Sequence, residues 1–583
     1  MAALPVTTAI LLVALTTPLL YLYRLAYRRR PYHGIPHNPR STRRLFGDIP
    51  ELTAEAQRAG DPAKMTYAQF ASLGSPIIQL FLMPFWRPMV YLNDTREVED
   101  LLQNRTREFD KARATIAPFR PLVPGASICK VKGPLWKAQV RLWTDIISPG
   151  FLRNQAAPIM YRSAVQLVEL FRAKAAVSGG RPFYVAEDFK IATFDVIWMA
   201  MLGSDQNGIN KEREAVLQWA DAIKQPESKD EPSELAMAPK SDEWKAAVYF
   251  LSLVPSTLMS PIPGLLHFIY SLTPTWRKHW ATKKHLMQDL IRQSKERFAD
   301  LGDAKNDDSV AEVRDICALD RALRKFAKVS PADIYRPTTD DMYDELFLLL
   351  MSGHETTATL LAWMAKILTN APAEQTKLRD ALRAYFTASP KTPPVEAILA
   401  ADIPYLNASI EELVRVGNII PEVVREASCD TELLGKRIPK GAMIVCSTYV
   451  SHKPFDEETI PESARSVNSR LNKGGYGAIW QQDMEEYHPE RWMRDDESFD
   501  AKAVPKLAFS AGPRGCFGEC ILLPIANEKN VGRKFAQQQF RIMLVVLVLN
   551  FEFLPIPEDL NSYDAFSKLT RSPCQCFARM KPI

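Results

Sequence analysis

The feature that most constrains this chain's fold is a long helical pattern from about Asp340 to Asn370, which is apolar on nearly every face. Thr338, Thr339 and Asp340 are capping candidates at its start, and Pro372 follows its end. A helix without a polar face cannot lie on the surface of a water-soluble domain. We therefore expect this helix to run through the centre of the protein, with the other elements packed around it.

Helical patterns also dominate the rest of the chain, and no internal repeat is visible. Apolar residues recur with helical spacing in four further segments: 160–175, 212–223, 274–298 and 373–386. Short runs typical of β-strands occur at 77–81, 89–92 and 443–447. The sequence therefore predicts a mainly α fold with a smaller β portion.

The amino-terminal segment 4–23 contains no charged residue, and arginines follow it at 24, 28, 29 and 30. A helix of about twenty residues spans the roughly 30 Å of a membrane's hydrocarbon core. Positive charge after the apolar run, and none before it, favours an uncleaved signal-anchor over a cleaved signal peptide. We expect a lumenal end at 1–3, a transmembrane helix at 4–23, a basic, proline-containing linker at 24–40 and a globular domain at 41–583. A buried amino-terminal helix is the alternative.

Charge and cysteine content exclude several classes of protein. Lysine and arginine total 73 against 68 acidic residues, a net charge of +5 without a long basic tract, so we expect no binding to nucleic acid. The eight cysteines form no C-x-x-C pair and no even framework of spacings, which indicates reduced thiols facing the cytosol. A metal site at Cys516/Cys520 or Cys574/Cys576 is an alternative, although no histidine lies at zinc-like spacing.

One late loop has the composition needed to hold a single cysteine in a fixed place. It runs from Phe509 to Gly518 and reads FSAGPRGCFG. Glycines such as Gly512 permit backbone angles that other residues resist, and Arg514 brings a permanent charge that can pair with a carboxylate. Backbone N–H groups around Cys516 can temper the charge of a thiolate. A glycine-rich loop around a buried structural cysteine is the alternative.

The pattern Phe-x-x-Gly-x-Arg-x-Cys-x-Gly is met in full at 509–518, and it resembles the signature of the cytochrome P450 superfamily. The resemblance implies a haem b cofactor, with Cys516 as the axial thiolate ligand of the iron and Arg514 beside a propionate. Phe509, Gly512 and Gly518 would shape the cofactor loop. A thiolate ligand favours O–O cleavage, so the resemblance implies a monooxygenase of the cytochrome P450 fold in the domain at 41–583.

The middle of the long helix carries polar residues, SGHETT from Ser352, that need a reason for burial. Gly353 leaves room for a ligand to approach the backbone. The segment resembles the family's Ala/Gly-Gly-x-Asp/Glu-Thr motif, although Ser352 departs from it. By that match Thr356 hydrogen-bonds dioxygen and Glu355 helps to relay protons, while we expect His354 to be structural or near solvent. A polar break in a core helix and an intra-helix salt bridge of Glu355 are the alternatives.

Two further motifs resemble the family's scaffold. Glu412 and Arg415 lie three apart on one helical face, and Arg491 lies in the later sequence YHPERW. The resemblance implies that these three form a buried charge network behind the cysteine loop. Glu411 is an alternative partner of Arg415 at a spacing of four.

Two more residues match family positions that meet a haem propionate. Arg425 resembles an arginine of the β-strand region, and Trp136 resembles the family's propionate-binding tryptophan. The arginine that usually follows four positions later is replaced by Val140, with Arg141 next. Four basic residues nearby form either a docking patch for an acidic reductase or a solvated helix face: Lys130, Lys132, Lys137 and Arg141.

The resemblance also implies partners and a location. The chain has no flavin or nicotinamide fingerprint, so electrons are expected from NADPH through NADPH-cytochrome P450 reductase in the endoplasmic reticulum membrane, with the catalytic domain in the cytosol. The family's substrate-contacting stretches are apolar here, which indicates a lipophilic substrate. The motifs resemble fungal microsomal members that act in secondary metabolism. The alternatives are an O2-independent haem-thiolate isomerase or dehydratase, which the Glu355–Thr356 pair argues against, and a non-catalytic haem-thiolate protein.

Three stretches are longer than the family pattern: 519–532, about 461–478, and a short excess between Trp136 and Pro149. In each, the pattern resumes cleanly afterwards. They are either genuine loops or sequence retained through an imperfect gene model. A genuine insertion at 519–532 would put the haem affinity in doubt, because it directly follows the cysteine loop.

Overall fold

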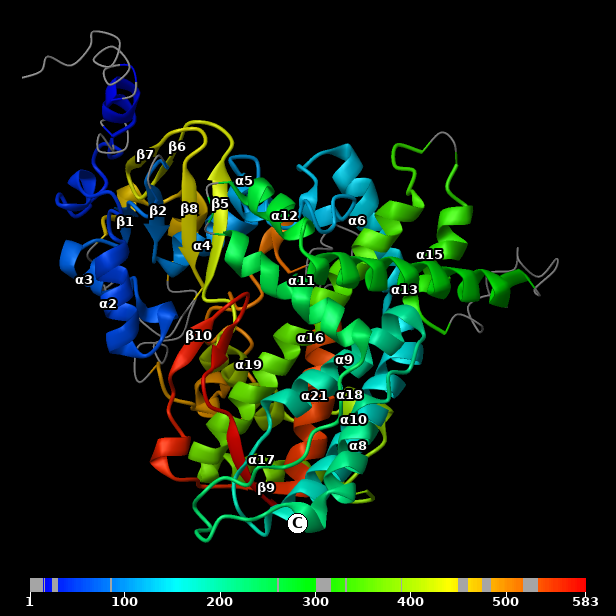
Figure 1. The fold of residues 1–583 in the computed structure, drawn as a ribbon. Helices are drawn as coiled ribbons and strands as arrows, with labels where there is room; N and C mark the ends of the chain where they lie inside the picture. The colour runs from blue at the N-terminus through cyan, green and yellow to red at the C-terminus, as the bar shows by residue number, and fades with distance from the viewer. Residues whose placement is uncertain are drawn as a thin grey trace, which may run out of the picture. The chain divides into compact units, whose positions relative to one another are not determined.

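The structure is a computed structural model of the 583-residue chain. It describes residues 14, 16–23, 30–83, 86–258, 260, 262–299, 316–330, 333–389, 391–448, 460–473, 484–516 and 533–583. These residues form two compact units, which Figure 1 shows with their labelled elements. The first unit takes its described residues from 1–112, 422–448 and 453–473, and the second takes them from the remainder of the chain.

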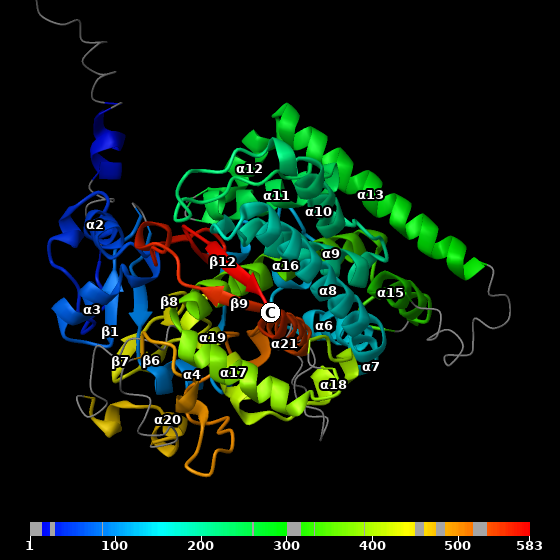
Figure 2. The same ribbon diagram turned by 90° about the horizontal axis from the view of Figure 1, so that it is seen from below.

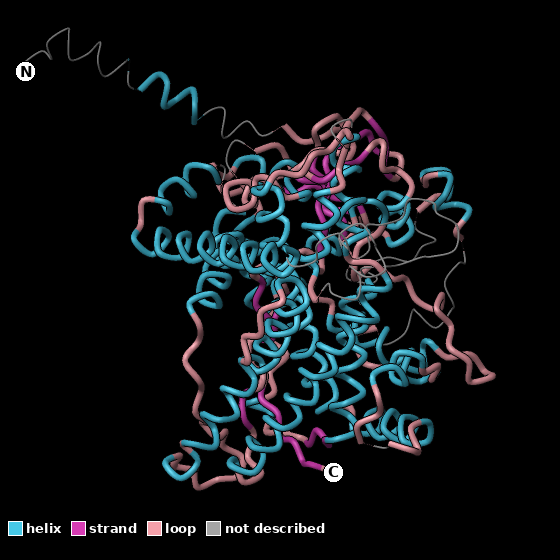
Figure 3. Tube along the Cα trace, turned by 90° about the vertical axis from the view of Figure 1, so that its right-hand side faces the viewer, coloured by secondary structure: helices cyan, strands magenta, loops and turns pink. Residues whose placement is uncertain are grey.

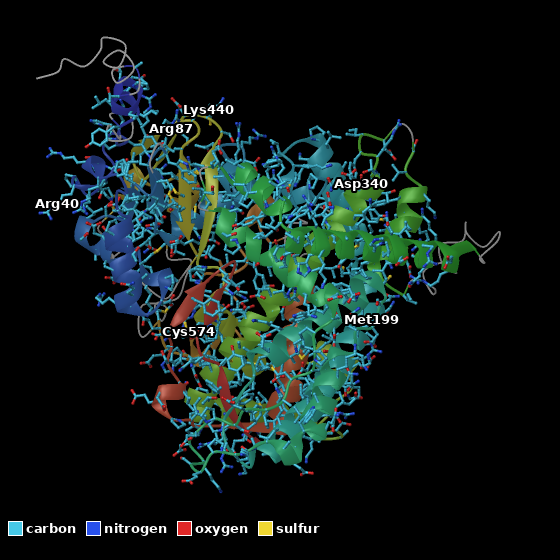
Figure 4. The ribbon with its side chains drawn as sticks, in the orientation of Figure 1. Arg40, Arg87, Met199, Asp340, Lys440 and Cys574 are labelled. Atoms are coloured by element: carbon cyan, nitrogen blue, oxygen red, sulfur yellow. The ribbon has the colours of Figure 1, made fainter. Side chains whose placement is uncertain are left out.

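A five-stranded sheet organises the first unit. Its strand order is β1 (Ile77–Leu80), β2 (Met89–Leu92), β8 (Met443–Ser447), β5 (Glu422–Ala427) and β3 (Phe109–Lys111). Only the β2–β8 pair is parallel, with Val90 opposite Ile444. A second pair, β6 (Thr431–Leu433) and β7 (Lys436–Ile438), forms a hairpin. Arg87 donates a hydrogen bond of 3.3 Å to the carbonyl of Lys440 just after that hairpin (Figure 4). Strands β1, β2 and β8 confirm the three strand segments that the sequence predicts at 77–81, 89–92 and 443–447.

Three helices of the first unit come before β5 in the chain: α2 (Ile49–Ala59), α3 (Tyr67–Leu73) and α4 (Thr95–Gln103). Leu52 of α2 and Phe70 of α3 pack against one sheet face, where Ile78, Tyr91 and Val445 are buried with them. Alternating strand residues place these side chains on the same face, so the burial of apolar area holds helices and sheet together.

Residues 460–473, part of the stretch that exceeds the family pattern, are bound tightly to α4. Asp94 pairs with the buried guanidinium of Arg465 at 2.9 Å, and Glu97 accepts from the Ser466 N–H at 2.9 Å. The stretch also contains the short helix α20 (Val467–Leu471). Buried charges are tolerated only with such partners. Residues 461–473 are thus packed into the first unit, and whether they are a genuine loop or retained sequence stays a prediction; residues 474–478 lie outside the described residues.

The second unit is built around α16 (Thr339–Asn370), as the sequence predicts. Thr338 and Asp341 form a capping box at its start, and the side chains from 357 to 369 are all buried. Figure 2 shows α9 (Ala186–Leu202), α19 (Pro404–Gly417) and α21 (Arg533–Asn550) around it. The other helices of the unit are α5 (Arg113–Ile116), α6 (Pro134–Ile146), α7 (Pro149–Phe151), α8 (Ala157–Ser178), α10 (Gly208–Gln218), α11 (Asp242–Leu258), α12 (Pro263–Ser271), α13 (Pro274–Ala299), α15 (Ala318–Ala327), α17 (Pro372–Tyr385) and α18 (Val395–Ala400).

Short strands add a small β portion to the second unit. They form a three-stranded sheet of β4 (Phe183–Tyr184), β12 (Phe577–Pro582) and β9 (Phe551–Leu554), and a pair of β10 (Ala565–Ser567) and β11 (Arg571–Pro573). Helix predominates over strand in the part of the trace that Figure 3 colours by secondary structure. The prediction of a mainly α fold with a smaller β portion is confirmed. The excess between Trp136 and Pro149 lies largely within the continuous helix α6.

Of the predicted transmembrane segment 4–23, the structure describes residue 14 and residues 16–23, which are helical and exposed. Within the part of the chain that the structure describes, no helix has both the length and the apolar character to span a membrane. The rest of the predicted segment lies outside the described residues.

Candidate active site

The cysteine loop is closed by its own backbone. The N–H of Cys516 donates to the carbonyl of Phe509 at 3.0 Å, and Gly515 N–H donates to Gly512 at 2.9 Å. Gly512 has a φ of 70°, a left-handed conformation that favours glycine. Phe509 packs against the hydrophobic core, while Cys516 is exposed. The loop thus presents a fixed, accessible thiol; Gly518, which the motif also includes, lies outside the described residues.

Arg514 and Trp136 come together although they are far apart in the sequence. The guanidinium of Arg514 lies 4.2 Å from the centroid of the Trp136 ring and donates to the Lys130 carbonyl at 3.1 Å. Both side chains are buried, a setting in which an arginine gains from a cation–π contact. The sequence thus named both residues of a cationic site beside the cysteine loop. Arg141, the displaced arginine, is exposed.

Arg425 lies in β5 of the first unit, where it is buried and donates to the carbonyl of Val424 at 3.1 Å. Its role at a propionate stays a prediction. Among the basic residues of the suggested docking patch, Lys137 and Arg141 are exposed, whereas Lys130 pairs with Asp341 at 3.3 Å.

Glu412, Arg415 and Arg491 meet as the motifs indicate. Arg415 donates to both carboxylate oxygens of Glu412, at 2.7 and 2.8 Å, and Arg491 donates to the same carboxylate at 3.1 Å. Burial by itself would raise the pKa of Glu412. The hydrogen bonds and positive charge of Arg415 lower that pKa by more, so it lies below its ordinary value. Glu411 instead pairs with Lys506 at 2.8 Å, so the alternative pairing with Arg415 is wrong.

The polar segment of α16 has mixed surroundings. His354 is fully buried against Phe194 and hydrogen-bonds the Leu350 carbonyl at 2.9 Å, so it is structural. The expectation that Gly353 makes room for a ligand stays a prediction, but the structure gives this glycine a second role. A Cβ there would lie 2.8 Å from the Ile197 Cδ1 of α9, so the missing side chain serves close helix packing.

One face of α16 remains accessible in the middle of this otherwise buried helix. Ser352 is exposed, and Leu349, Gly353 and Thr356, which share its face, are partly exposed. The Thr356 hydroxyl donates to the Ser352 carbonyl at 2.9 Å. Exposed surface of this kind can contact a bound group. Together with an accessible thiol and a buried arginine, these residues fit a haem with one thiolate ligand.

Glu355 is partly buried and lies within electrostatic reach of α9. Burial works against the charge of Lys190, but Glu187, at 2.7 Å, and Glu355 outweigh it, and the pKa of Lys190 is raised. Among the described residues, Glu355 has no ion pair within α16, which argues against an intra-helix salt bridge.

Sequence reasoning missed Glu345, a fully buried carboxylate of α16. It accepts hydrogen bonds from Ser127 and Gln139. An acid inside an apolar helix was the available signal, but its partners lie more than two hundred positions earlier in the chain.

The chain belongs to the cytochrome P450 family, because the family model described as Cytochrome P450 matches residues 39–457, more than half of its length. It is an oxidoreductase that incorporates oxygen from O2 and uses a haem, a redox partner and a small-molecule substrate. Cys516 lies beyond the matched residues, so its assignment rests on the loop itself.

Over nearly its whole length the chain is similar to fungal proteins named as cytochrome P450 monooxygenases. GME11363 of Pestalotiopsis microspora is 29% identical, with 98% of each chain covered. TRI13 of Fusarium sporotrichioides is 28% identical over 96% of each chain. The xilC protein of Penicillium crustosum is 28% identical, covering 97% of this chain and 95% of its own.

Proposed function

We propose that this protein is a haem b-dependent monooxygenase that inserts one oxygen atom of O2 into a lipophilic small molecule of fungal secondary metabolism. The observation that carries the proposal is the backbone-closed loop that exposes Cys516 beside the buried Arg514–Trp136 pair. When bound, the haem supplies the oxygen-activating chemistry. The fungal origin of the similar proteins supports the metabolic setting.

Each site residue has a specific task in this proposal. Cys516 supplies the thiolate, and Arg514, oriented by the Trp136 ring, neutralises a propionate. Thr356 and Glu355 hold and deliver protons on the accessible face of α16. Arg425 is a further proposed propionate partner.

The charge network is a support and takes no part in chemistry. Glu412, Arg415 and Arg491 are buried, and they keep the chain before the cysteine loop in one conformation. Saturated hydrogen bonding makes such a network rigid.

We also propose that the protein is anchored in the endoplasmic reticulum membrane by residues 4–23 and receives electrons from NADPH-cytochrome P450 reductase. The apolar run at 4–23 supports the anchor. A second support is an apolar stripe along α12, whose exposed side chains retain 49–61% of their surface: Ile262, Leu265, Phe268, Ile269 and Leu272. Full-length protein should resist carbonate extraction from membranes, and removal of residues 1–23 should weaken that resistance.

The deciding experiment is the difference spectrum of the reduced, CO-bound protein. A strongly red-shifted Soret band that disappears in Cys516→Ala is expected, because only thiolate ligation gives that shift. An unshifted band in the wild type would contradict the proposal. A variant without residues 519–532 shows whether that stretch prevents haem binding, and sequencing of the mature transcript decides whether it is translated.

A further inference from the structure

A loop of the second unit, residues 122–130, is tied along its length to α16, and we call it the strap. At its centre, three donors converge on the carboxylate of Glu345. The Ser127 N–H and hydroxyl both lie 2.6 Å away, and the Gln139 amide lies 2.9 Å away. Glu345 has no exposed surface. A buried carboxylate has no water to hydrate it, so it depends on these three donors. Hydrogen bonds to a charged acceptor are also stronger than those between neutral groups.

The strap also lies directly against the backbone of α16. The Gly125 N–H donates to Asp344 at 2.8 Å, and a Cβ on Gly125 would lie 2.9 Å from the Cα of Asp341. On another side, Lys283 of α13 donates to the Leu122 carbonyl at 2.8 Å and lies 3.5 Å from Asp344. Two helices therefore hold the strap at the end that precedes Ser127.

The other end of the strap contacts the cysteine loop. The Lys130 carbonyl accepts from Arg514 at 3.1 Å, and Arg514 lies over the Trp136 ring. Trp136 and Gln139 are three residues apart on α6, so neighbouring positions of one helix contact Arg514 and Glu345. Two short paths thus connect Glu345 with Arg514, one along the strap and one along α6.

We propose that Glu345 is a positioning residue for Arg514, acting through the strap and α6. Its importance for the cofactor rests on the proposed role of Arg514 at a haem propionate. A glutamine at 345 would keep one acceptor oxygen and replace the other by an uncharged N–H2 group, which cannot accept a hydrogen bond from the Ser127 N–H or from the Gln139 amide. The strap would then separate from α16 at Ser127, and Arg514 would lose the fixed carbonyl of Lys130.

Hydrogen exchange of the full-length protein tests this coupling without haem. In Glu345→Gln, exchange should accelerate at least about tenfold in residues 122–130 and also in 507–516. The matched control is Asp340→Asn, an exposed acid in the first turn of α16 (Figure 4), which should leave both segments unchanged. Faster exchange in the strap alone, or in neither segment, overturns the proposal.

A milder variant covers the case in which Glu345→Gln does not fold. Ser127→Ala removes only the hydroxyl donor, and it should accelerate exchange in the same two segments to a smaller extent. A response confined to residues 122–130 again overturns the coupling.

Haem retention gives a second readout and separates the two proposals. Glu345→Gln should release haem about tenfold faster than wild type, but should scarcely alter release of haem dimethyl ester, which offers Arg514 no carboxylate. Equal acceleration for both porphyrins overturns the positioning role. If the wild type binds no thiolate-ligated haem, the proposed function fails, while the exchange experiment still decides the coupling.

Discussion

The indole of Trp492 donates a hydrogen bond of 2.9 Å to Glu412, the same carboxylate that binds Arg415 and Arg491. The backbone N–H of His488 adds a further bond at 3.1 Å. The carboxylate therefore has a full set of donors, of which the sequence motifs name only the two arginines. Each donor offsets part of the cost of burying the charge, so loss of one partner affects the others.

Glu412→Gln should destabilise the protein by about 3–5 kcal/mol, because it removes the buried carboxylate charge that binds both Arg415 and Arg491. Thermal unfolding measures the loss. Lys377→Gln is the control, since it breaks an exposed pair with Glu490 and should cost at most about 1 kcal/mol. If the two substitutions lowered the stability equally, the buried network would contribute no more to stability than an exposed ion pair.

Gly353→Ala should cost about 1–3 kcal/mol, because its Cβ would lie 2.8 Å from Ile197 and α9 would have to shift. Gly264→Ala is a suitable control, since nothing lies within 4 Å of the added atom. Partial recovery of stability in the double variant Gly353→Ala/Ile197→Val would identify the contact. If Gly353→Ala left the stability unchanged, α16 and α9 would be loosely packed at this contact.

The stability of the protein should depend on the ionisation of Glu345. Burial raises the pKa of Glu345 from 4.5 to about 7, and the bonds from Ser127 and Gln139 and the charge of Lys130 only partly offset it. The folded state therefore binds the proton more tightly than the unfolded chain. The stabilisation that protonated Glu345 contributes is fully present below pH 4.5 and is lost as the pH rises through 7.

The stability difference between wild type and Glu345→Gln should accordingly fall by up to about 3 kcal/mol between pH 5 and pH 8. Both proteins share the other titratable groups of this region, which are Asp341, Asp344 with its partner Lys283, and the uncharged Tyr335 phenol. Urea unfolding across this pH range measures the difference. A constant difference would show that Glu345 does not titrate there.

Cysteine alkylation should follow accessibility. In haem-free protein Cys516 should react rapidly, together with the exposed Cys429 and Cys574. Cys446 and Cys576 should react slowly, because burial raises the pKa of each to about 12. After haem loading, mass spectrometry should find Cys516 alone protected among the three fast thiols, and continued reaction of Cys516 would contradict its role as ligand.

Arg465→Met should destabilise the protein by about 3–5 kcal/mol, because it leaves Asp94 buried beside α4 without its partner. Arg470→Met in the same stretch is the control. If both variants were neutral in thermal unfolding, residues 461–473 would not be an integral part of the first unit.

The sequence predicted local features well because they depend on nearby residues. The bounds and cap of α16 follow from its apolar pattern and from Thr338, and the Glu412–Arg415 pair follows from helical spacing. Long-range partners could not be predicted in this way. Gln139 lies 206 positions from Glu345, and no local pattern links the two. The packing role of Gly353 could not be predicted either, because a glycine beside a ligand and a glycine at a helix crossing look identical in one sequence.

The joint between α4 and residues 460–473 also limits how this family member can have evolved. Besides capping α4, Asp94 pairs with Arg465, and Glu97 accepts from the Ser466 N–H, so the two segments depend on each other for these contacts. A lineage that loses the stretch must replace these acids at nearly the same time or carry uncompensated charge. Among relatives, the two segments should therefore be inherited, altered and lost together, and a chimaera that exchanges only one of them should fold poorly.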